Sequence, residues 1–569
     1  MGTGRKSFRA LFEPGHETAF VKTEPPPSSR GFDWFIGRPI GVLRAVPWLV
    51  AAITALLACE FVVLRGEDQN WDLLNYHYYS GYAVVNGRFA DDVAPSGLQT
   101  YLHPLNSVLT FLAYSKLAFP FSSLALLGVQ LLVLPALVLL GREVGKGLGH
   151  QDVSVSETLA LALGLAAPVW WSELGTSFYS SSTASLVLFG VWFLMRGAAD
   201  ISSNAELLRR TAAAGACMGL ATALKLTNAI FVIAAGLALI PTLSRFGVRS
   251  ASMRALAYSV GVLLGFAAVA WWYVLLYREF DNPVFPLFNG IFKSNYFDAI
   301  NFRDPRWTFA TLGESLRFPI AAAAGTIKTS EVEFADGRLL LCMGLALLAA
   351  VDRLFATRIE RRACGAAPSM LLWFVAAGIG AWAILLAYQR YLIPVELLLG
   401  VTVWVLLGQI VVSERRIVIR MALCLLVALS LMRIPDWGHH AAADRASSNI
   451  FGLQLPEDLM RHPAEYLVAG SPNGFILAFL SPGSHFYRID FSVRVYGRIR
   501  AALDRYPNRR VKLITMPSVP GVFEAAAELG YERDGNCTSF RAHVETYIAC
   551  DMRKRSGAAG SGGEDGIRR

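Results

Sequence analysis

Residues 65–104 read RGEDQNWDLLNYHYYSGYAVVNGRFADDVAPSGLQTYLHP and directly follow the first long apolar stretch of the chain. The segment is polar and rich in aromatic residues, and apolar stretches of bilayer-spanning length lie on both sides of it. It must therefore lie as a loop at one face of a membrane. An acid held there beside aromatic and amide side chains is suited to take a proton from a substrate. Asp72, beside Trp71, Asn75 and Tyr76, is such an acid.

The composition restricts the class of protein. The chain has 569 residues, of which 54% are hydrophobic and only 17% are charged. Soluble globular proteins carry about 25% charged residues, so this chain has too little charged surface to be soluble. Its apolar residues come in blocks of about 17–25, the length that crosses the hydrocarbon layer as a helix. We therefore expect a multi-pass membrane protein, whose net charge of +9 reflects membrane orientation and not a nucleic-acid partner.

The apolar blocks predict about eleven membrane-spanning segments. They lie near residues 41–64, 121–141, 157–174, 179–196, 211–226, 227–243, 255–277, 338–351, 368–387, 391–412 and 417–433. Arginines gather in alternate loops, as at residues 353–362, and the positive-inside rule makes that side cytoplasmic. The loops 65–120 and 278–338 then lie outside, with the C-terminal region. Residues 103–119 contain Lys116 and are expected to form a juxtamembrane helix in the interface.

These expectations divide the chain into four parts. A flexible cytoplasmic tail at residues 1–40 precedes the membrane domain at 41–435, and a disordered tail at 555–569 ends the chain. Between them, residues 437–554 alternate short β-like and helix-like runs, which predicts a small soluble α/β domain on the outer side. Cys537 and Cys550 in this domain could form a disulfide or remain two free thiols. The predicted location is the inner (cytoplasmic) membrane, with the domain on the periplasmic or extracellular side.

Asp72 has an ordinary structural explanation beside the functional one. Asn70 can cap a helix that begins at Trp71, which leaves Asp72 in the first turn, where the helix dipole favours a carboxylate. The aromatic residues around it favour a substrate-binding role, because Tyr76, His77 and several tyrosines follow on the same helix.

Four further residues carry charge at the predicted outer ends of spans. Glu173 is either a second acid facing Asp72 or an ordinary interfacial acid. Lys225 divides about thirty apolar residues, where an ionisable group is costly and is read as functional, with a lipid phosphate as its natural partner. Arg390, followed by Tyr391, suits forked phosphate contacts but could also be a snorkelling arginine. His103 could donate to a phosphate or cap the helix that follows it.

Five short motifs occur in order along residues 40–435. They are NWDLLNYHYY at 70–79, HPL at 103–105, SELGTSFY at 172–179, GLATALK at 219–225 and RYLIP at 390–394. Each is weak alone, but their order and shared outer placement resemble the GT-C superfamily of membrane glycosyltransferases. The resemblance implies an all-α, GT-C-like membrane domain, followed here by the small α/β domain.

The resemblance also implies an activity. An inverting glycosyltransferase of this type moves a monosaccharide from a polyprenyl-phosphate donor to a hydroxyl group of a glycan, lipid or protein. Asp72 matches the catalytic base and Glu173 the second acid, while Lys225, Arg390 and His103 match positions that bind the donor phosphate. Residues expected to line the substrate cavity are Trp71, Asn75, Tyr76, His77 and Tyr391.

Similar proteins often have an aspartate where this chain reads SSS at residues 180–182. This argues against a metal bridged by several carboxylates, so no cofactor is predicted and a divalent cation is left open. Two other functions compete with the enzyme. A transporter or flippase of lipid-linked saccharides predicts internal repeats and helices broken at mid-membrane. A non-catalytic subunit of cell-envelope polysaccharide assembly predicts that Asp72 is dispensable.

Overall fold

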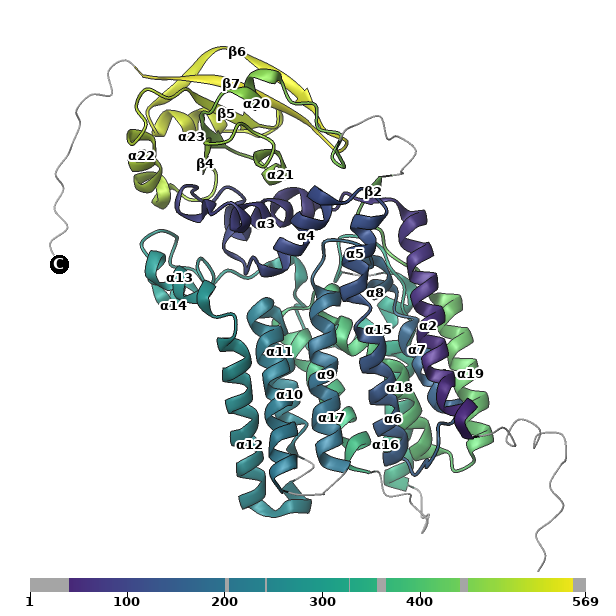
Figure 1. Ribbon diagram of the computed structural model, residues 1–569. Coiled ribbons are helices and arrows are strands. Elements are labelled where there is room, and N and C mark those ends of the chain that lie inside the picture. Colours follow the sequence, from purple (N-terminus) through teal and green to yellow (C-terminus); the bar gives the residue numbers. More distant parts are fainter. Residues whose placement is uncertain are drawn as a thin grey trace, which may run out of the picture.

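The computed structural model describes residues 40–199, 204–240, 243–326, 328–355, 365–440 and 449–555. The predicted tails lie almost wholly outside these ranges, as do the arginines of the loop at 356–362. Figure 1 shows an upright bundle of long helices, a layer of short helices on one end of it, and a domain containing a β-sheet on top of that layer.

The bundle contains a helix in each apolar segment predicted to span. The helices are α2 (Ile40–Arg65), α5 (Phe121–Gln130), α6 (Val133–Gly147), α7 (Val155–Leu165), α8 (Pro168–Glu173), α9 (Ser180–Ala199), α10 (Asn204–Leu224), α11 (Ala229–Leu237), α12 (Leu243–Ala267), α16 (Arg338–Phe355), α17 (Ala366–Leu385), α18 (Ile393–Ile410) and α19 (Glu414–Leu431). Five helical segments of the described chain are long and apolar enough to cross a membrane. The chain is therefore a membrane protein, although the number of spans predicted from the sequence is larger.

Three predicted spans are not single helices. Residues 121–141 are divided between α5 and α6, and residues 157–174 between α7 and α8. Helix α8 can begin at Pro168, because the N–H group that proline lacks would have no partner in the first turn of a helix. In the span predicted at 255–277, the residues up to Ala267 belong to α12. The residues from Trp271 onward belong to a separate helix, α13 (Trp271–Phe280). The loop at 278–338 also contains helices, α14 (Asn289–Phe292), the 3₁₀ turn η6 (Pro305–Trp307) and α15 (Leu312–Ala324).

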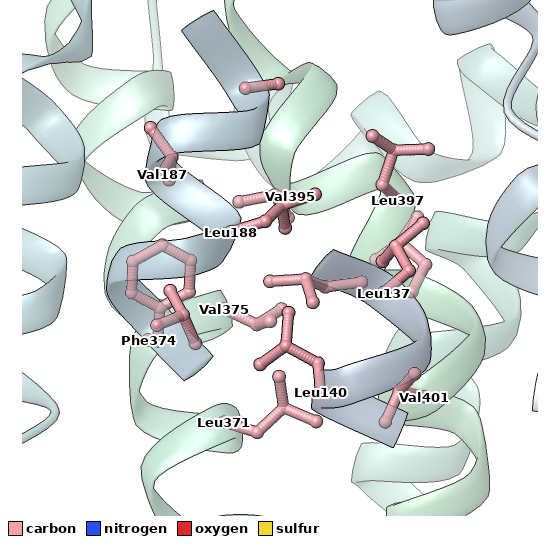
Figure 2. Packing of buried hydrophobic residues seen from close by; sticks show 14 of the residues in the cluster. Leu137, Leu140, Val187, Leu188, Leu371, Phe374, Val375, Val395, Leu397 and Val401 are labelled. Carbon is pink, nitrogen blue, oxygen red and sulfur yellow. The ribbon is translucent and has the colours of Figure 1, made fainter. Parts of the chain in front are cut away.

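Helix α18 lies at the centre of the bundle. Figure 2 shows its Val395, Leu397 and Val401 packed against side chains of α6, α9 and α17. Small residues let α7 approach it closely, since a Cβ on Gly164 would overlap the carbonyl oxygen of Leu397. Close approach at glycines is the usual packing of helices in a bilayer, where apolar burial alone does not drive association.

The layer of short helices is built mostly from the loop that follows α2. It comprises the π-helix η1 (Leu73–His77), α3 (Tyr78–Val85), the 3₁₀ helices η2 (Arg88–Ala90) and η3 (Gly97–Tyr101), and α4 (Leu105–Lys116), with α13 beside them. Helix α4 occupies most of the segment predicted as a juxtamembrane helix. It packs closely on α3, where a Cβ on Gly81 would overlap the carbonyl oxygen of Ser107.

The upper domain has a five-stranded sheet with the order β4-β3-β5-β7-β6. Strands β3 (Glu465–Val468), β4 (His485–Arg488) and β5 (Val511–Thr515) are parallel, and β6 (Tyr531–Arg541) and β7 (Thr546–Lys554) are antiparallel. The helices are α20 (Glu457–Arg461), α21 (Gly474–Leu477), the 3₁₀ turn η9 (Val493–Val495), α22 (Tyr496–Asp504) and α23 (Val522–Glu528). Cys537 and Cys550 form a disulfide between β6 and β7, which resolves the alternative left open by the sequence.

The α/β domain is hydrogen-bonded to the layer beneath it. The N–H group of Val93 donates to the carbonyl of Phe486 (2.8 Å), and the N–H group of Arg488 donates back to Val93 (2.9 Å). Strand β1 (Glu67–Asp68) in the loop pairs with β2 (His439–His440), which precedes the domain. The loop that carries Asp72 is therefore fixed by the α/β domain and by the segment that leads into it.

Candidate functional site

Asp72 lies at the start of the π-helix, in a turn that its neighbours build. The N–H of Asn70 and its side-chain amide both donate to Asp68 Oδ1 (3.0 and 2.6 Å), and Asn70 Oδ1 accepts from the N–H of Leu73 (2.8 Å). Asn70 thus caps the helix, as its position in the sequence predicts. The wider π-turn that follows is a form of helix often found at functional sites.

Asp72 and Arg390 form an ion pair although 318 residues separate them in the chain. Arg390 Nη1 lies 3.1 Å from Asp72 Oδ2, and the two side chains are only 9% and 17% exposed. The guanidinium stacks on the ring of Phe178, with 3.9 Å to its centre, and lies 5.5 Å from the ring centre of Trp437. Its Nε also donates to the hydroxyl of Tyr388 (2.9 Å). Arg390 is thus held in place by aromatic rings, which argues against an arginine that only snorkels to solvent.

Lys225 and Glu173 are held by adjacent serines at the start of α9. Lys225 Nζ donates to Ser180 Oγ (2.6 Å) and lies 4.8 Å from the ring centre of Tyr391, the neighbour of Arg390. Glu173 is fully buried, and its Oε2 accepts from both the N–H and the hydroxyl of Ser181 (2.8 Å each). Two of the three serines in the SSS run therefore bind the candidate cation and the second acid. Within the described residues no group of three His, Cys, Asp or Glu side chains could hold a metal ion.

His77 and Tyr76 form part of the same wall. The ring of His77 lies between those of Tyr76 and Tyr179, with 4.0 Å between centres on each side. Burial lowers the pKa of His77 well below its ordinary value, and the positive charges of Lys225 and Arg390 lower it further. The imidazole is therefore neutral at physiological pH, and its Nδ1 has no hydrogen-bond partner within the described chain.

The other predicted site residues lie in different surroundings. Asn75 is buried beneath the α/β domain, where a Cβ on Gly474 would overlap its carbonyl oxygen. Trp71 is exposed. His103 has no contact with the two cations: its Nε2 is hydrogen-bonded to the carbonyl of Val269 (3.0 Å), and its Nδ1 accepts from the N–H of Leu105 (3.3 Å). Both ring nitrogens are engaged by the backbone, which favours the capping alternative for His103 over phosphate binding.

Asp68 is a site residue that the sequence reasoning missed. Its Oδ1 orders Asn70, and its Oδ2 accepts from the N–H of Ser177 (2.8 Å) in the loop that follows Glu173. This carboxylate joins the loop of Asp72 to the loop of Glu173. In the sequence, the only indication of this role was the position of Asp68 between the first span and the residue that caps the helix.

The end of the bundle beneath the α/β domain thus combines one partly exposed carboxylate, a buried second acid and two cations. Asp72 contacts Arg390, whose neighbour Tyr391 lies against Lys225. Lys225 and Glu173 in turn bind two adjacent serines, Ser180 and Ser181. Such a set can neutralise a phosphate and take a proton from a hydroxyl group.

Comparisons with known proteins agree with this architecture. Residues 101–298 match glycosyltransferase family 87, a range that includes Glu173 and Lys225 but neither Asp72 nor Arg390. No curated protein sequence matches the chain.

Two solved structures of ArnT share the fold over most of the chain. ArnT from Cupriavidus metallidurans, in the apo state and bound to undecaprenyl phosphate, has a TM-score of 0.50 and 15% identity, with 89% of this chain and 98% of ArnT covered. The oligosaccharyltransferase of Archaeoglobus fulgidus in its apo form has a TM-score of 0.48 and 13% identity, with 85% and 70% covered. The chain therefore contains a region similar to glycosyltransferase family 87 and shares the fold of ArnT.

Proposed function

We propose that the protein is an inverting glycosyltransferase that transfers a monosaccharide from a polyprenyl-phosphate donor to a hydroxyl acceptor, with Asp72 as the general base. The observation that carries this proposal is the ion pair between Asp72 and Arg390, with Lys225 one aromatic ring away. A base and two cations in one site match the needs of a reaction that deprotonates a hydroxyl and expels a phosphate.

The donor assignment is supported by the cations and by the fold. ArnT, which shares the fold, has been crystallised with undecaprenyl phosphate. In this chain a donor phosphate would take the place of Asp72 as the partner of Arg390 and would reach Lys225 on its other side. The lipid tail would lie between helices of the bundle.

The chemistry then follows in one displacement. Asp72, released from Arg390, accepts the proton of the acceptor hydroxyl as its oxygen forms a bond to the anomeric carbon. The bond from that carbon to the phosphate oxygen breaks, and the electron pair leaves with the phosphate. Arg390 and Lys225 stabilise the new charge in a site with little water. A single displacement inverts the anomeric centre.

The charge of the loops supports a site at the outer face of the inner membrane. Described arginines such as Arg142 in α6, Arg209 in α10 and Arg415 in α19 lie toward the ends of these helices that are opposite to the site, and the positive-inside rule makes those ends cytoplasmic. The N-terminus then faces the cytoplasm, and the α/β domain lies outside.

An assay of the purified full-length protein in lipid nanodiscs tests the proposal. Radiolabelled polyprenyl-phosphate sugars are offered with glycan, glycolipid and peptide acceptors, and the wild type is compared with Asp72→Asn. We expect the wild type to transfer the labelled sugar from one of the donors to an acceptor, and Asp72→Asn not to do so. Movement of the donor across the bilayer without transfer would instead identify a flippase, and transfer that survives the substitution would exclude Asp72 as the base.

A further inference from the structure

A cavity of about 430 Å³ lies between the layer of short helices and the α/β domain. Its walls come from α3, η2, η3 and α13 on one side and from α22 on the other. Asp72, Lys225 and Arg390 do not line it, so it is separate from the reaction centre. The volume lies in the range of about 300–1,000 Å³ that small-molecule sites have. We propose that this cavity binds a saccharide and holds the acceptor glycan, an assignment that rests on the proposed glycosyl transfer.

Six aromatic residues line the cavity. The rings that line it are those of Tyr79, Phe89, Tyr101, Trp271, Trp272 and Phe280. Trp271 is 47% exposed although it is large and apolar. Flat aromatic faces pack against the C–H faces of sugar rings, while the hydroxyl groups at the sugar's edge remain free for polar contacts.

The polar groups of the cavity suit a neutral ligand with many hydroxyls. Ser80 lines the cavity and is only 6% exposed, yet its Oγ has no hydrogen-bond partner within the described residues. A buried hydroxyl without a partner is unfavourable unless a ligand supplies one. Asp91 lies on one part of the lining and Arg498 and Arg505 on another. Arg498 is already paired with Glu279 (2.9 Å). The lining carries both signs of charge; a saccharide can hydrogen-bond to both signs, whereas an acyl chain can hydrogen-bond to neither.

The position of the cavity fits the part of an acceptor that does not react. Ser80 follows Asp72 by eight residues along η1 and α3, which is about two turns of helix. A glycan of more than one unit can therefore fill the cavity and still present its terminal hydroxyl to Asp72. Because α22 closes the cavity, the α/β domain contributes directly to acceptor binding.

Filling the cavity is the first test. Ala501 is exposed on the side of α22 that lines the cavity, so Ala501→Trp adds a ring there without touching the reaction centre. Val493, just before α22, is exposed and does not line the cavity, so Val493→Trp is the matched control. With mannose, arabinose and glucose oligosaccharides as acceptors of the full-length protein, we expect Ala501→Trp to raise the glycan KM about tenfold. The donor KM and the control should be unchanged; an unchanged glycan KM, or an equal rise for the donor, overturns the assignment.

Direct binding separates this assignment from the proposed reaction. Calorimetric titration with the same oligosaccharides, free and attached to a lipid, should give equal affinities for both forms and weaker binding in Ala501→Trp. Trp271→Ala, which removes a ring and adds no bulk, should also weaken binding and serves if the first variant fails to fold. Binding of the lipid-linked form alone would refute a saccharide site. Glycan binding that depends on Ala501, without transfer in the wild type, would refute the reaction and retain the site.

Discussion

Replacing Asp72 by asparagine removes one charge and leaves the shape of the side chain almost unchanged. In the wild type Asp72 Oδ2 lies 3.1 Å from Arg390 Nη1, and both groups are largely buried. At an effective dielectric constant of about 20, two unit charges at this distance attract by about 5 kcal/mol before the cost of desolvation is subtracted. A donor phosphate must compete with this attraction to bind Arg390. In Asp72→Asn it meets no such competitor.

Two opposite changes are therefore expected in Asp72→Asn. The kcat should fall by about 10²- to 10⁴-fold, the usual contribution of a general base. The Kd for undecaprenyl phosphate should stay the same or decrease, because Arg390 is free. Asp281→Asn is the matched control, since Asp281 lies in another loop at φ 53°, a conformation that asparagine adopts readily. Single-turnover rates and lipid-phosphate binding measure the two effects. A kcat within about tenfold of the wild type, or weaker phosphate binding, would refute the reasoning.

Arg390→Lys keeps the charge but loses the planar group that stacks on Phe178, so the donor KM should rise about tenfold or more in steady-state kinetics; an unchanged KM would contradict a forked phosphate contact. Burial raises the pKa of Asp92 to about 6, although its ion pair with Arg88 opposes the shift. Since an unfolded aspartate has a pKa of about 3.9, the folded state binds the proton more tightly between these values, and stability should fall as the pH rises through that window. Melting temperatures measured across it should fall less in Asp92→Asn than in the wild type, and an equal fall would exclude Asp92 as the cause. Replacing Cys537 and Cys550 by serine should lower the free energy of unfolding of the α/β domain by about 2–4 kcal/mol in a denaturant titration, and reducing agent should have no further effect on that variant.

Local signals in the sequence predicted the features that depend on neighbouring residues. Apolar length located the bundle helices, because crossing a bilayer needs a minimum number of apolar residues. The cap by Asn70 was predictable for the same kind of reason, since a cap involves residues three positions apart. The break before α8 also had a local signal in Pro168, but it lies inside an apolar run that hydropathy alone reads as continuous.

Contacts between distant segments could not be read in the same way. Asp68 and Ser177 are 109 residues apart, and no local pattern indicates that a carboxylate in one loop orders the backbone of the other. The ion pair of Asp72 and Arg390 was foreseen only as shared placement at one face, because charge and topology fix the side of the membrane but not the partner. His103 shows the limit most clearly. A histidine before a helix is compatible both with capping and with phosphate binding, and only the hydrogen bond of its Nε2 with the carbonyl of Val269 distinguishes the two roles.

The arrangement of the loop explains why an α/β domain is attached to a bundle that already carries the charged residues. On the bundle side, Asp68 fixes the turn before Asp72 through Ser177. On the other side, Asp92 accepts from the N–H of Phe486 (3.0 Å), so the domain holds the end of the same loop. A loop anchored on one side only would let Asp72 follow Arg390 wherever the guanidinium moves, and the pair would stay closed when a donor arrives. In the proposed mechanism, a carboxylate anchored on both sides would keep its position while a donor phosphate pairs with Arg390, and the base would stay aimed at the acceptor.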